Sequence, residues 1–535
     1  MIHEDTASYS QGQKYRRGVS KPEGFGGAAD ARRARRPMDW LRQRRSNEDA
    51  ALAAARKSAS SYSAVGSRFT PRPAQVLSMF DLALIACSNA AMLLGVHGRL
   101  GVLSFAQAAI ASVCIITANM VFLYAMGCFR RDAIVSKQNA ISRLPIVIGL
   151  AAVVFFLALH FGLPLAFPQD RVYLSISRCA TISFVCAGVS LVALVISRYV
   201  FFAMMHRQWF QRRIMVIGSG PRASHLLSLM NHEPHKSHAH LIFVDEDVLR
   251  ARNAEPADGA KPGRSGCKSP EKLATEHGVD EIVIAVDDSR GLPFEGLLAC
   301  KVRGVPITDY HSFIERETGR VDLRFIDPSY LVYSHGFQMR ALDRIAKRSL
   351  DILFSLVLLS ICLPVFAMAS LAIWLEGGGA IFYRQERVTQ GDRVFWLYKL
   401  RTMRPDAEKD GARWASSSDS RITKVGKFLR RTRIDEIPQI LNILKGDMSL
   451  VGPRPERPVF VDEIGKEVGM FALRHGVKTG LTGWAQINYP YGASIEDAAR
   501  KLEYDLYYMK NYNWFRDISI ILQTIRIVIL QEGVR

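Results

Sequence analysis

Cysteine is scarce in this 535-residue chain, which has eight cysteines and no Cys-x-x-Cys pair. This scarcity excludes a small disulfide-stapled fold and argues against a cysteine-based zinc site. The histidines show no metal-site spacing either. Six of the cysteines lie in or at the ends of apolar runs, where cysteine behaves as a small buried hydrophobic residue: Cys87, Cys114, Cys128, Cys179, Cys186 and Cys362.

Acidic residues are outnumbered, with 50 Asp and Glu against 70 Lys and Arg and a net charge of +20. A nucleic-acid partner would explain the excess, but the sequence lacks a zinc finger, an RNA-binding aromatic motif and an isolated basic recognition helix. The basic residues instead flank apolar segments. We therefore expect anionic lipids and phosphorylated substrates as partners, and no nucleic acid.

No apolar run precedes Ala74, so the N-terminus does not resemble a secretory signal peptide. Residues 1–74 carry 15 Lys and Arg against 7 Asp and Glu, and we interpret them as a disordered basic cytoplasmic tail. Four segments of membrane-spanning length follow, at about residues 75–96, 103–128, 145–167 and 179–204. Residues 75–205 are thus predicted to form a four-helix transmembrane domain.

The distribution of basic residues predicts how these helices are oriented. Basic residues are concentrated in the tail, after the second segment and after the fourth, whereas the other two loops hold few. The positive-inside rule then places both ends of the four-helix block in the cytoplasm. The basic residues after the second and fourth segments are Arg130, Arg131, Lys137 and Arg143, and Arg207, Arg212 and Arg213.

Residues 213–335 alternate short apolar strands with helical patterns, which predicts a doubly wound parallel sheet, a Rossmann-like α/β domain. Gly218-x-Gly220-x-x-Ala223 follows the first strand and matches a dinucleotide-binding fingerprint. One alternative function is therefore an NAD-dependent nucleotide-sugar epimerase or dehydratase. Such enzymes usually use a Tyr-x-x-x-Lys base, and none of the 17 tyrosines has Lys four residues later. We interpret the region as a degenerate nucleotide-binding or regulatory domain.

A fifth apolar run, residues 352–375, allows two topologies. It is long enough to cross a bilayer, which would place the basic C-terminal region outside the cell, against the positive-inside rule. Pro364 lies in the middle and predicts a break, so the run could instead enter and leave the same face. The physical arguments leave these two alternatives open.

The C-terminal region reads as mixed α/β. Residues 382–388 and 393–400 predict a hairpin around Gln390-Gly391-Asp392, and residues 421–446 predict helices. Residues 505–530 combine several aromatic side chains with a short apolar stretch, which predicts one helix lying in the membrane interface.

Six ordered motifs in the last 190 residues or so resemble the bacterial sugar transferase family, the polyprenyl-phosphate hexose-1-phosphate transferases. The whole layout is similar to the long, undecaprenyl-phosphate glucose phosphotransferase type. Thr479 departs from the family, which commonly has Pro before this Gly, and a small change in that loop is expected. The motifs are Lys347-Arg348-x-x-Asp351, Tyr383-Arg384-Gln385-Glu386-Arg387-Val388, Lys399-Leu400-Arg401-Thr402-Met403, Arg430-x-x-x-x-Asp435-Glu436-Ile437-Pro438-Gln439, Lys445 to Pro455, and Gly480 to Gln486.

The resemblance implies transfer of hexose-1-phosphate, from glucose or galactose, from a UDP-sugar to undecaprenyl phosphate with release of UMP. This would be the first membrane step of exopolysaccharide, capsule or O-antigen synthesis. It also implies a transferase domain at residues 344–535, with a re-entrant membrane helix at 347–375 and an interfacial C-terminal helix. The expected location is the bacterial inner membrane, multi-pass, with the catalytic domain in the cytoplasm. Homo-oligomerisation stays open.

The family's functional positions map onto individual residues of this chain. The resemblance implies that Asp435 is the nucleophile that carries the phospho-sugar and that Glu436 helps to hold Mg²⁺. Lys399, Arg430 and Arg454 occupy phosphate-contacting positions. Lys347, Arg348, Asp351 and Pro364 mark the interface where polyprenyl phosphate or lipid head groups would bind, while Arg431 and Arg433 are interpreted as lipid-facing. A third alternative, an inactive scaffold of a polysaccharide assembly complex, is disfavoured by the intact Asp435-Glu436 pair and Arg454.

Overall fold

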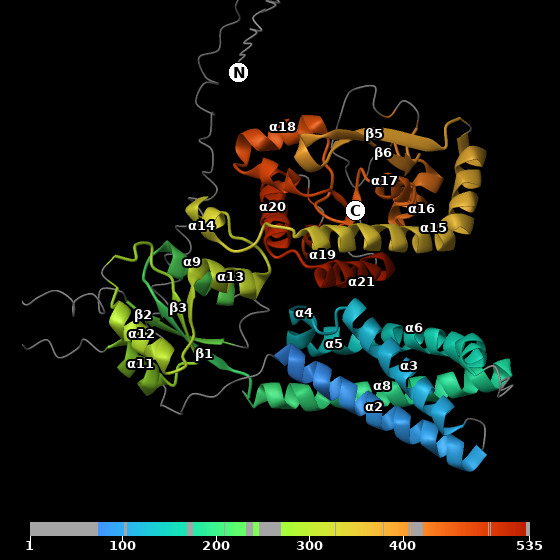
Figure 1. Cartoon of the computed structure of the whole chain (residues 1–535), viewed down its shortest axis with the longest axis horizontal. Helices are drawn as coiled ribbons and strands as arrows, with labels where there is room; N and C mark the ends of the chain where they lie inside the picture. Colours follow the sequence, from blue (N-terminus) through green and yellow to red (C-terminus); the bar gives the residue numbers. More distant parts are fainter. Residues whose placement is uncertain are drawn as a thin grey trace, which may run out of the picture. The chain divides into compact units, whose positions relative to one another are not determined.

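The structure, a computed structural model, is described here from residue 73 to residue 530, so the expected basic tail lies almost entirely outside the described residues. All described residues belong to one unit of the chain, Arg45–Arg535. Along the sequence they form an apolar helical block, a parallel α/β region and a C-terminal mixed region (Figure 1). The described ranges are 73–100, 104–167, 175–207, 209–231, 239–245, 269–290, 292–326, 328–377, 379–404, 407, 421–490, 492 and 494–530.

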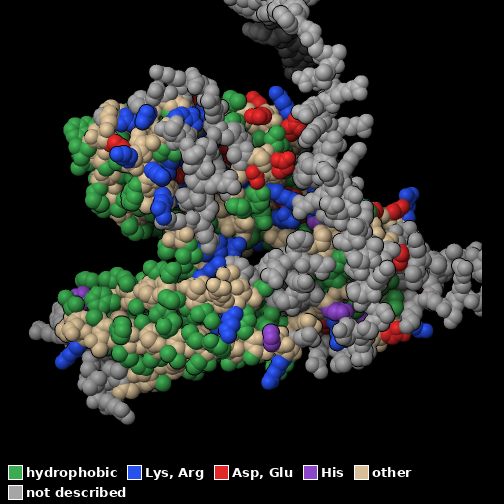
Figure 2. Space-filling view, turned by 180° about the vertical axis from the view of Figure 1, so that it is seen from behind, with side chains coloured by type: hydrophobic (Ala, Val, Ile, Leu, Met, Phe, Trp, Pro, Cys, Tyr) green, Lys and Arg blue, Asp and Glu red, His purple; other side chains and the backbone are tan. Residues whose placement is uncertain are grey.

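The first region is a block of apolar helices. Helix α2 packs against α3 and α8, and α6 packs against the same two helices. Figure 2 shows hydrophobic side chains along its visible face. Four stretches are long and apolar enough to cross a bilayer, Pro73–Met92, Phe105–Ala125, Lys137–Ala166 and Ile176–His206, in line with the sequence prediction. The helices are α2 (Pro73–Leu100), α3 (Phe105–Ala125), α4 (Arg131–Val135), α5 (Lys137–Ser142), α6 (Leu144–Leu157), the π-helix η1 (Ala158–Gly162), α7 (Leu163–Ala166) and α8 (Ile176–His206).

A buried ion pair joins α2 to α8 inside this block. Nη1 of Arg198 donates to both carboxylate oxygens of Asp81, at 2.8 and 2.9 Å, and the hydroxyl of Ser197 donates to the same carboxylate. Both charged side chains are fully buried. A charge buried among apolar helices is costly unless it is paired, so this pair strongly favours one register of α2 against α8.

The second region is a four-stranded parallel sheet in the order β2-β1-β3-β4, which confirms the predicted parallel α/β architecture. Its strands are β1 (Arg212–Ile217), β2 (Ala239–Val244), β3 (Glu281–Ile284) and β4 (Ile307–Asp309). Its helices are α9 (Pro221–Asn231), α11 (Pro270–His277), α12 (Phe294–Val302), α13 (Tyr310–Thr318) and α14 (Pro328–Tyr333).

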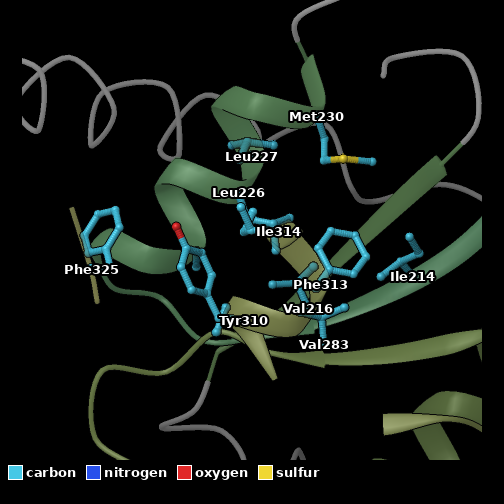
Figure 3. Close-up of a cluster of buried hydrophobic side chains, with 12 residues drawn as sticks. Ile214, Val216, Leu226, Leu227, Met230, Val283, Tyr310, Phe313, Ile314 and Phe325 are labelled. Atoms are coloured by element: carbon cyan, nitrogen blue, oxygen red, sulfur yellow. The ribbon is translucent and has the colours of Figure 1, made fainter. Parts of the chain in front are cut away.

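Both faces of this sheet are covered by helices. Because successive side chains of a strand point to opposite faces, Ile214 and Val216 pack against α9 and α13, while Met215 and Ile217 pack with residues of α11 and α12. Figure 3 shows the first of these cores, with Leu226 among the helix residues that face the strands. Burial on both faces of the sheet therefore explains why the sequences of the central strands are almost entirely apolar.

The glycine-rich turn of the dinucleotide fingerprint is formed, but the carboxylate of Asp287 lies against it. Gly218 has a φ of 139°, and a Cβ on Gly220 would lie 2.1 Å from Oδ2 of Asp287. Arg222 donates to the carbonyl of Val286 at 3.0 Å and lies 3.5 Å from Asp287. A negative charge at the turn that would hold a pyrophosphate disfavours phosphate binding there, which supports the interpretation of a degenerate site.

The fifth apolar run forms most of a single 37-residue helix, α15 (Ala341–Gly377), with the exposed Pro364 inside it. It is a fifth stretch apolar and long enough to cross a membrane. Figure 1 shows α15 as a long arm and a shorter arm that turns away from it. Large apolar side chains are exposed along both arms, among them Leu353, Ile361, Leu371 and Leu375.

Both arms of α15 pack against the same C-terminal region. Arg348, on the first arm, donates to the carbonyls of Ile443 and Leu444 at 2.6 and 2.7 Å. Glu376, at the end of the second arm, accepts from the amide of Val425 at 3.0 Å. A straight helix of this length would span ~55 Å, so a bend brings its two ends back to one domain. Passage through the membrane interface stays a prediction.

The C-terminal region contains the predicted antiparallel hairpin, β5 (Phe382–Val388) with β6 (Val394–Leu400), joined through η2 (Gln390–Asp392). A second pair of short parallel strands, β7 (Ser449–Val451) and β8 (Gly480–Thr482), contributes buried residues to the core of the region. The helices are α16 (Lys424–Arg431), the 3-10 turn η3 (Ile434–Glu436), α17 (Gln439–Lys445), α18 (Pro458–Glu467), the 3-10 helix η4 (Phe471–Gly476), α19 (Trp484–Asn488), α20 (Ile495–Lys510) and α21 (Trp514–Leu530).

The expected single helix over residues 505–530 is wrong, because the structure divides this stretch between α20 and α21. Asn511 ends α20, and the side chain of Asn513 accepts a hydrogen bond from the amide of Phe515 at 3.0 Å, just before α21 begins. Asparagine competes with the backbone for hydrogen bonds and so favours helix ends over helix interiors. Tyr507 and Tyr508 therefore lie in the last turn of α20, and Trp514 and Phe515 lie at the start of α21.

Candidate active site

Asp435 and Glu436 lie together on the 3-10 turn η3, between α16 and α17. Arg433, just before the turn, is in the left-handed backbone region with a φ of 61°, and Pro438 forms the N-cap position of α17. The positive φ of Arg433 therefore interrupts the helical backbone between α16 and η3. This break from regular α-helix presents both carboxylates, which are 7% and 8% exposed, and α17 begins directly after Pro438.

Three basic side chains surround the carboxylate of Glu436. Nζ of Lys399, from β6, donates to Oε1 at 3.1 Å, and Nη2 of Arg454, from the loop after β7, donates to the same oxygen at 3.1 Å. Nη1 of Arg433 lies 3.9 Å from Oε1. The structure therefore brings together Lys399, Glu436 and Arg454, which the sequence analysis singled out and which are separated by up to 55 positions in the chain.

The two neighbouring carboxyls have opposite electrostatic environments. Burial and the charge of Glu436 raise the pKa of Asp435 above its ordinary value, against the opposing effect of Lys399, Arg430 and Arg433. Burial would also raise the pKa of Glu436, but Lys399 and Arg454 outweigh it and hold this pKa well below its usual range. The site therefore contains one carboxylate that is firmly ionised and one whose ionisation depends on the cations around it.

Arg430 lies near this cluster but is held by a different partner. Its Nε donates to the hydroxyl of Thr402 at 2.8 Å, while its charge helps to lower the pKa of Asp435. Arg430 can therefore act on the site electrostatically, and contact with a phosphate stays a prediction.

Arg433 is the residue that the sequence interpretation missed. It was expected to face lipid, but the left-handed turn directs its guanidinium toward Glu436. Arg431, by contrast, is exposed. A non-glycine residue at positive φ has no reliable sequence signature, so only its position three residues before Glu436 could have suggested the contact.

Lys347 and Asp351 lie inside the protein, where they attach α15 to the C-terminal region. Nζ of Lys347 lies 2.8 Å from Asp517 and 2.9 Å from the carbonyl of Val451. Asp351 accepts from Ser449 and from the amide of Leu450. Arg348 completes the attachment at the C-terminal end of α17, where a cation satisfies the last carbonyls. Binding of the acceptor's phosphate by these residues stays a prediction.

The carboxylates could contribute to a metal site only together with another ligand. No group of three or more His, Cys, Asp or Glu side chains in the described part of the chain could hold an ion by itself. The contacts of Glu436 with Lys399 and Arg454 both use Oε1. Mg²⁺ is commonly bound through one or two carboxylates plus substrate phosphates. Asp435 and Glu436 fit that pattern, with a diphosphate supplying the remaining oxygens.

Comparisons with known proteins identify the family of the C-terminal region. The family model described as bacterial sugar transferase matches residues 342–531. The chain is 38% identical over 192 residues to an uncharacterized sugar transferase of Bacillus subtilis, a match covering 36% of this chain and 91% of the relative.

Two longer relatives extend the similarity. One is a UDP-N-acetylgalactosamine-undecaprenyl-phosphate N-acetylgalactosaminephosphotransferase of Aeromonas hydrophila, 37% identical over 250 residues that cover 46% of this chain and 58% of the relative. The other is an undecaprenyl-phosphate glucose phosphotransferase of Komagataeibacter xylinus, 30% identical over 329 residues that cover 59% of this chain and 58% of the relative. The chain thus spans somewhat over half of each. With the acidic pair, its basic partners and these matches together, the chain belongs to the bacterial sugar transferase family.

Proposed function

We propose that the protein transfers a hexose-1-phosphate from a UDP-sugar to undecaprenyl phosphate and releases UMP. The observation that carries this proposal is the buried Asp435–Glu436 pair with Lys399, Arg433 and Arg454 converging on it. Phosphoryl transfer needs a nucleophile and cations around the phosphate oxygens, and this cluster supplies both. The names of the relatives, which include undecaprenyl phosphate, support the same reaction.

Asp435 is proposed as the nucleophile, in two balanced steps. Its carboxylate oxygen forms a bond to the β-phosphorus of the UDP-sugar while the bridging bond between the two phosphates breaks and UMP leaves with the electron pair. A phosphate oxygen of undecaprenyl phosphate then attacks the same phosphorus, which frees the Asp435 carboxylate and yields the lipid diphosphate sugar. Asp435 suits this role because Glu436, not Asp435, accepts the hydrogen bonds of Lys399 and Arg454.

The basic side chains would stabilise charge during both steps. Arg454 offers a planar guanidinium that can bind phosphate oxygens through two N–H groups, whereas Lys399 supplies a compact charge. Mg²⁺, where bound, would neutralise part of the diphosphate's charge, held by Glu436 and Asp435 together with the substrate. Because the protein lacks a third acidic ligand in its described part, we expect weak Mg²⁺ binding in the absence of a UDP-sugar.

We also propose that α15 is re-entrant and that the catalytic region lies in the cytoplasm of a bacterial inner-membrane protein. Attachment of Arg348 and Glu376, near opposite ends of α15, to the same C-terminal region supports this topology. A helix that crossed the membrane fully would have its ends on opposite sides. The basic loops of the first helical block support the cytoplasmic side.

The donor sugar is proposed to be glucose or galactose, on the resemblance to the long glucose type. The Aeromonas relative carries an N-acetylgalactosamine name, so UDP-N-acetylgalactosamine is the competing donor. Incubating membranes containing the full chain with undecaprenyl phosphate, Mg²⁺ and each radiolabelled UDP-sugar tests the choice. We expect label in the lipid extract from UDP-glucose or UDP-galactose, at least tenfold above an Asp435→Asn control. Labelling from UDP-N-acetylgalactosamine alone would contradict the choice of sugar, and no labelling from any UDP-sugar would contradict the function.

A further inference from the structure

The loop that carries Arg454 is held from outside at four consecutive carbonyls. Two of the bonds come from backbone amides: Pro453 accepts from Gly480 at 2.8 Å and Glu456 accepts from Val388 at 3.0 Å. The other two come from arginine side chains, Arg387 to Pro455 at 2.9 Å and Arg474 to Arg454 itself at 3.0 Å. Pro453 and Pro455 have no N–H, so the loop depends on these outside donors for its conformation.

Arg474 is a buried cation, and its counter-ion, Asp505, lies on α20. It belongs to η4 and is 4% exposed. Its Nη2 lies 2.9 Å from Oδ2 of Asp505, a 2%-exposed carboxyl on α20. The same Nη2 donates to the carbonyl of Arg454. One nitrogen thus connects a buried carboxyl to the backbone of a residue whose side chain contacts Glu436.

Burying such an ion pair gives little stability by itself, because the cost of removing two charges from water offsets their attraction. The charges around Asp505 come from three elements: Arg474 on η4, Glu456 in the loop before α18 and Lys501 on α20. Burial is the largest influence and raises the pKa of Asp505 to about 6. Glu456 adds to this shift, whereas Arg474 and Lys501 oppose it. At pH 7 and above the carboxyl is therefore mostly ionised and can orient Arg474.

We infer that Arg474 and Asp505 are positioning residues for the transfer reaction, acting through the backbone of Arg454. Asp505 orients the Arg474 guanidinium, and Arg474 fixes the Arg454 carbonyl so that the Arg454 side chain remains directed at Glu436 and the substrate's phosphates. This inference rests on the proposed function and adds to it two residues, 31 positions apart in the chain, that no sequence motif connects.

A double-mutant cycle on the full chain in detergent tests the inference, with UMP release at pH 7.5 as the readout. Arg474→Lys keeps the charge, but its side chain is one bond shorter and ends before the position of Nη2, the atom that contacts both partners. We expect it to lower turnover by roughly tenfold, about the effect of one lost charge-assisted hydrogen bond. Asp505→Asn is the second variant and should lower turnover in the same direction. The matched control is Arg500→Lys, because Arg500 lies on α20 with Asp505 and is paired with Glu503. It should change turnover by less than about twofold.

The same substitutions in an Arg454→Ala background distinguish positioning from general damage. If Arg474 acts through Arg454, Arg474→Lys should cost less than about twofold once the Arg454 side chain is absent, because effects on one pathway are not additive. Equal losses in both backgrounds, or no loss from either single variant in a folded protein, would overturn the inference. A wild-type protein that releases no UMP would instead contradict the proposed function. Melting temperatures of all variants identify any that fail to fold. If Arg474→Lys does not fold, the comparison of Asp505→Asn in the two backgrounds still decides the question.

Discussion

Lys399 links the two carboxyls of the site, because it bonds Glu436 and is also the strongest of the cations that lower the pKa of Asp435. Burial in turn lowers the pKa of Lys399 itself, although both carboxylates oppose this shift. In the proposed mechanism, only the ionised form of Asp435 attacks phosphorus. The fraction of active enzyme at acid pH is therefore set by one lysine and two adjacent acids.

The pH dependence of turnover tests this coupling. Because the folded pKa of Asp435 is raised, kcat/KM should fall as the pH drops through a value higher than that of an ordinary aspartate. Lys399→Met removes the largest opposing charge, so the half-maximal pH of the acid limb should rise further. The measurement is kcat/KM for UMP release between pH 4 and pH 9, each variant being normalised to its own maximum. An acid limb that is unchanged or shifted to lower pH in Lys399→Met would contradict the assignment.

At the scale of elements, the end of β7 and the start of β8 lie so close together that only glycine fits at residues 452 and 480. A Cβ on Gly452 would lie 2.3 Å from the carbonyl oxygen of Lys478, and one on Gly480 would lie 2.1 Å from the amide nitrogen of Gly452. The sugar transferase motifs around these two glycines therefore meet in space. Gly452 lies two residues before Arg454 in the chain. The packing of β7 against β8 therefore helps to fix the backbone position from which the Arg454 side chain extends.

Gly452→Ala should consequently destabilise the C-terminal region by roughly 1–3 kcal/mol, the usual cost of overpacking. We expect a lower melting temperature and a loss of turnover, measured on the same detergent-solubilised protein. Gly465→Ala is the matched control, since Gly465 lies in α18 with nothing within 4 Å of its added Cβ. That change should raise stability slightly, because alanine favours a helix over glycine. Equal melting temperatures for the two variants would contradict the packing argument.

The topology of α15 can be tested by labelling. In a background without the native cysteines, single cysteines at residues 340–346 and 380–384 should react with a membrane-impermeant reagent only after the cytoplasmic side is exposed. Both ends of α15 contact one domain, so the two sets should behave alike. Labelling of residues 380–384 from the outside of intact cells would show a helix that crosses the membrane fully.

At the scale of the whole molecule, the α/β region and the transferase region share a core. Val321 is buried with Phe471, Leu502 and Leu506, and Leu331 packs against the same cluster. The amide of Val321 donates to the carbonyl of Glu503 at 3.0 Å, and the indole of Trp484 donates to the carbonyl of Gly319 at 2.7 Å. Residues near 320–335 therefore contribute to both regions, which bears on where a functional fragment can begin.

Two truncated proteins make this testable. The proposed nucleophile and cations all lie after Lys347, so a protein of residues 340–535 in nanodiscs should retain UMP release. Because it would expose Leu502, Leu506 and Phe471, we expect it to melt at a lower temperature than a protein of residues 319–535, which keeps Val321 and Leu331. Activity only in the full chain, with both fragments folded, would place part of the site upstream. Equal melting temperatures would contradict the shared core.

The sequence predicted those features that local patterns encode. The hairpin over 382–400, the parallel strands and the Asp435-Glu436 pair follow from periodicity or from motif resemblance. The failures involve interactions that have no local signature. Arg433 faces the site because of a left-handed backbone, Lys347 turns inward to Asp517, and the pairing of Arg474 with Asp505 depends on how η4 meets α20. Such contacts follow from tertiary packing, which residue spacing does not determine.

The central claim is that Asp435 becomes covalently attached to the phospho-sugar, and a reaction without acceptor tests it directly. Purified full-length protein is mixed with a UDP-sugar and Mg²⁺ in the absence of undecaprenyl phosphate, and UMP and protein mass are measured. We predict a burst of UMP approaching one equivalent per protein, together with an added hexose-phosphate on the peptide containing Asp435 that disappears when undecaprenyl phosphate is added. Asp435→Asn should give neither signal, because an amide cannot form the acyl phosphate. Rapid turnover with acceptor, but no UMP and no adduct without it, would show direct transfer and contradict the account.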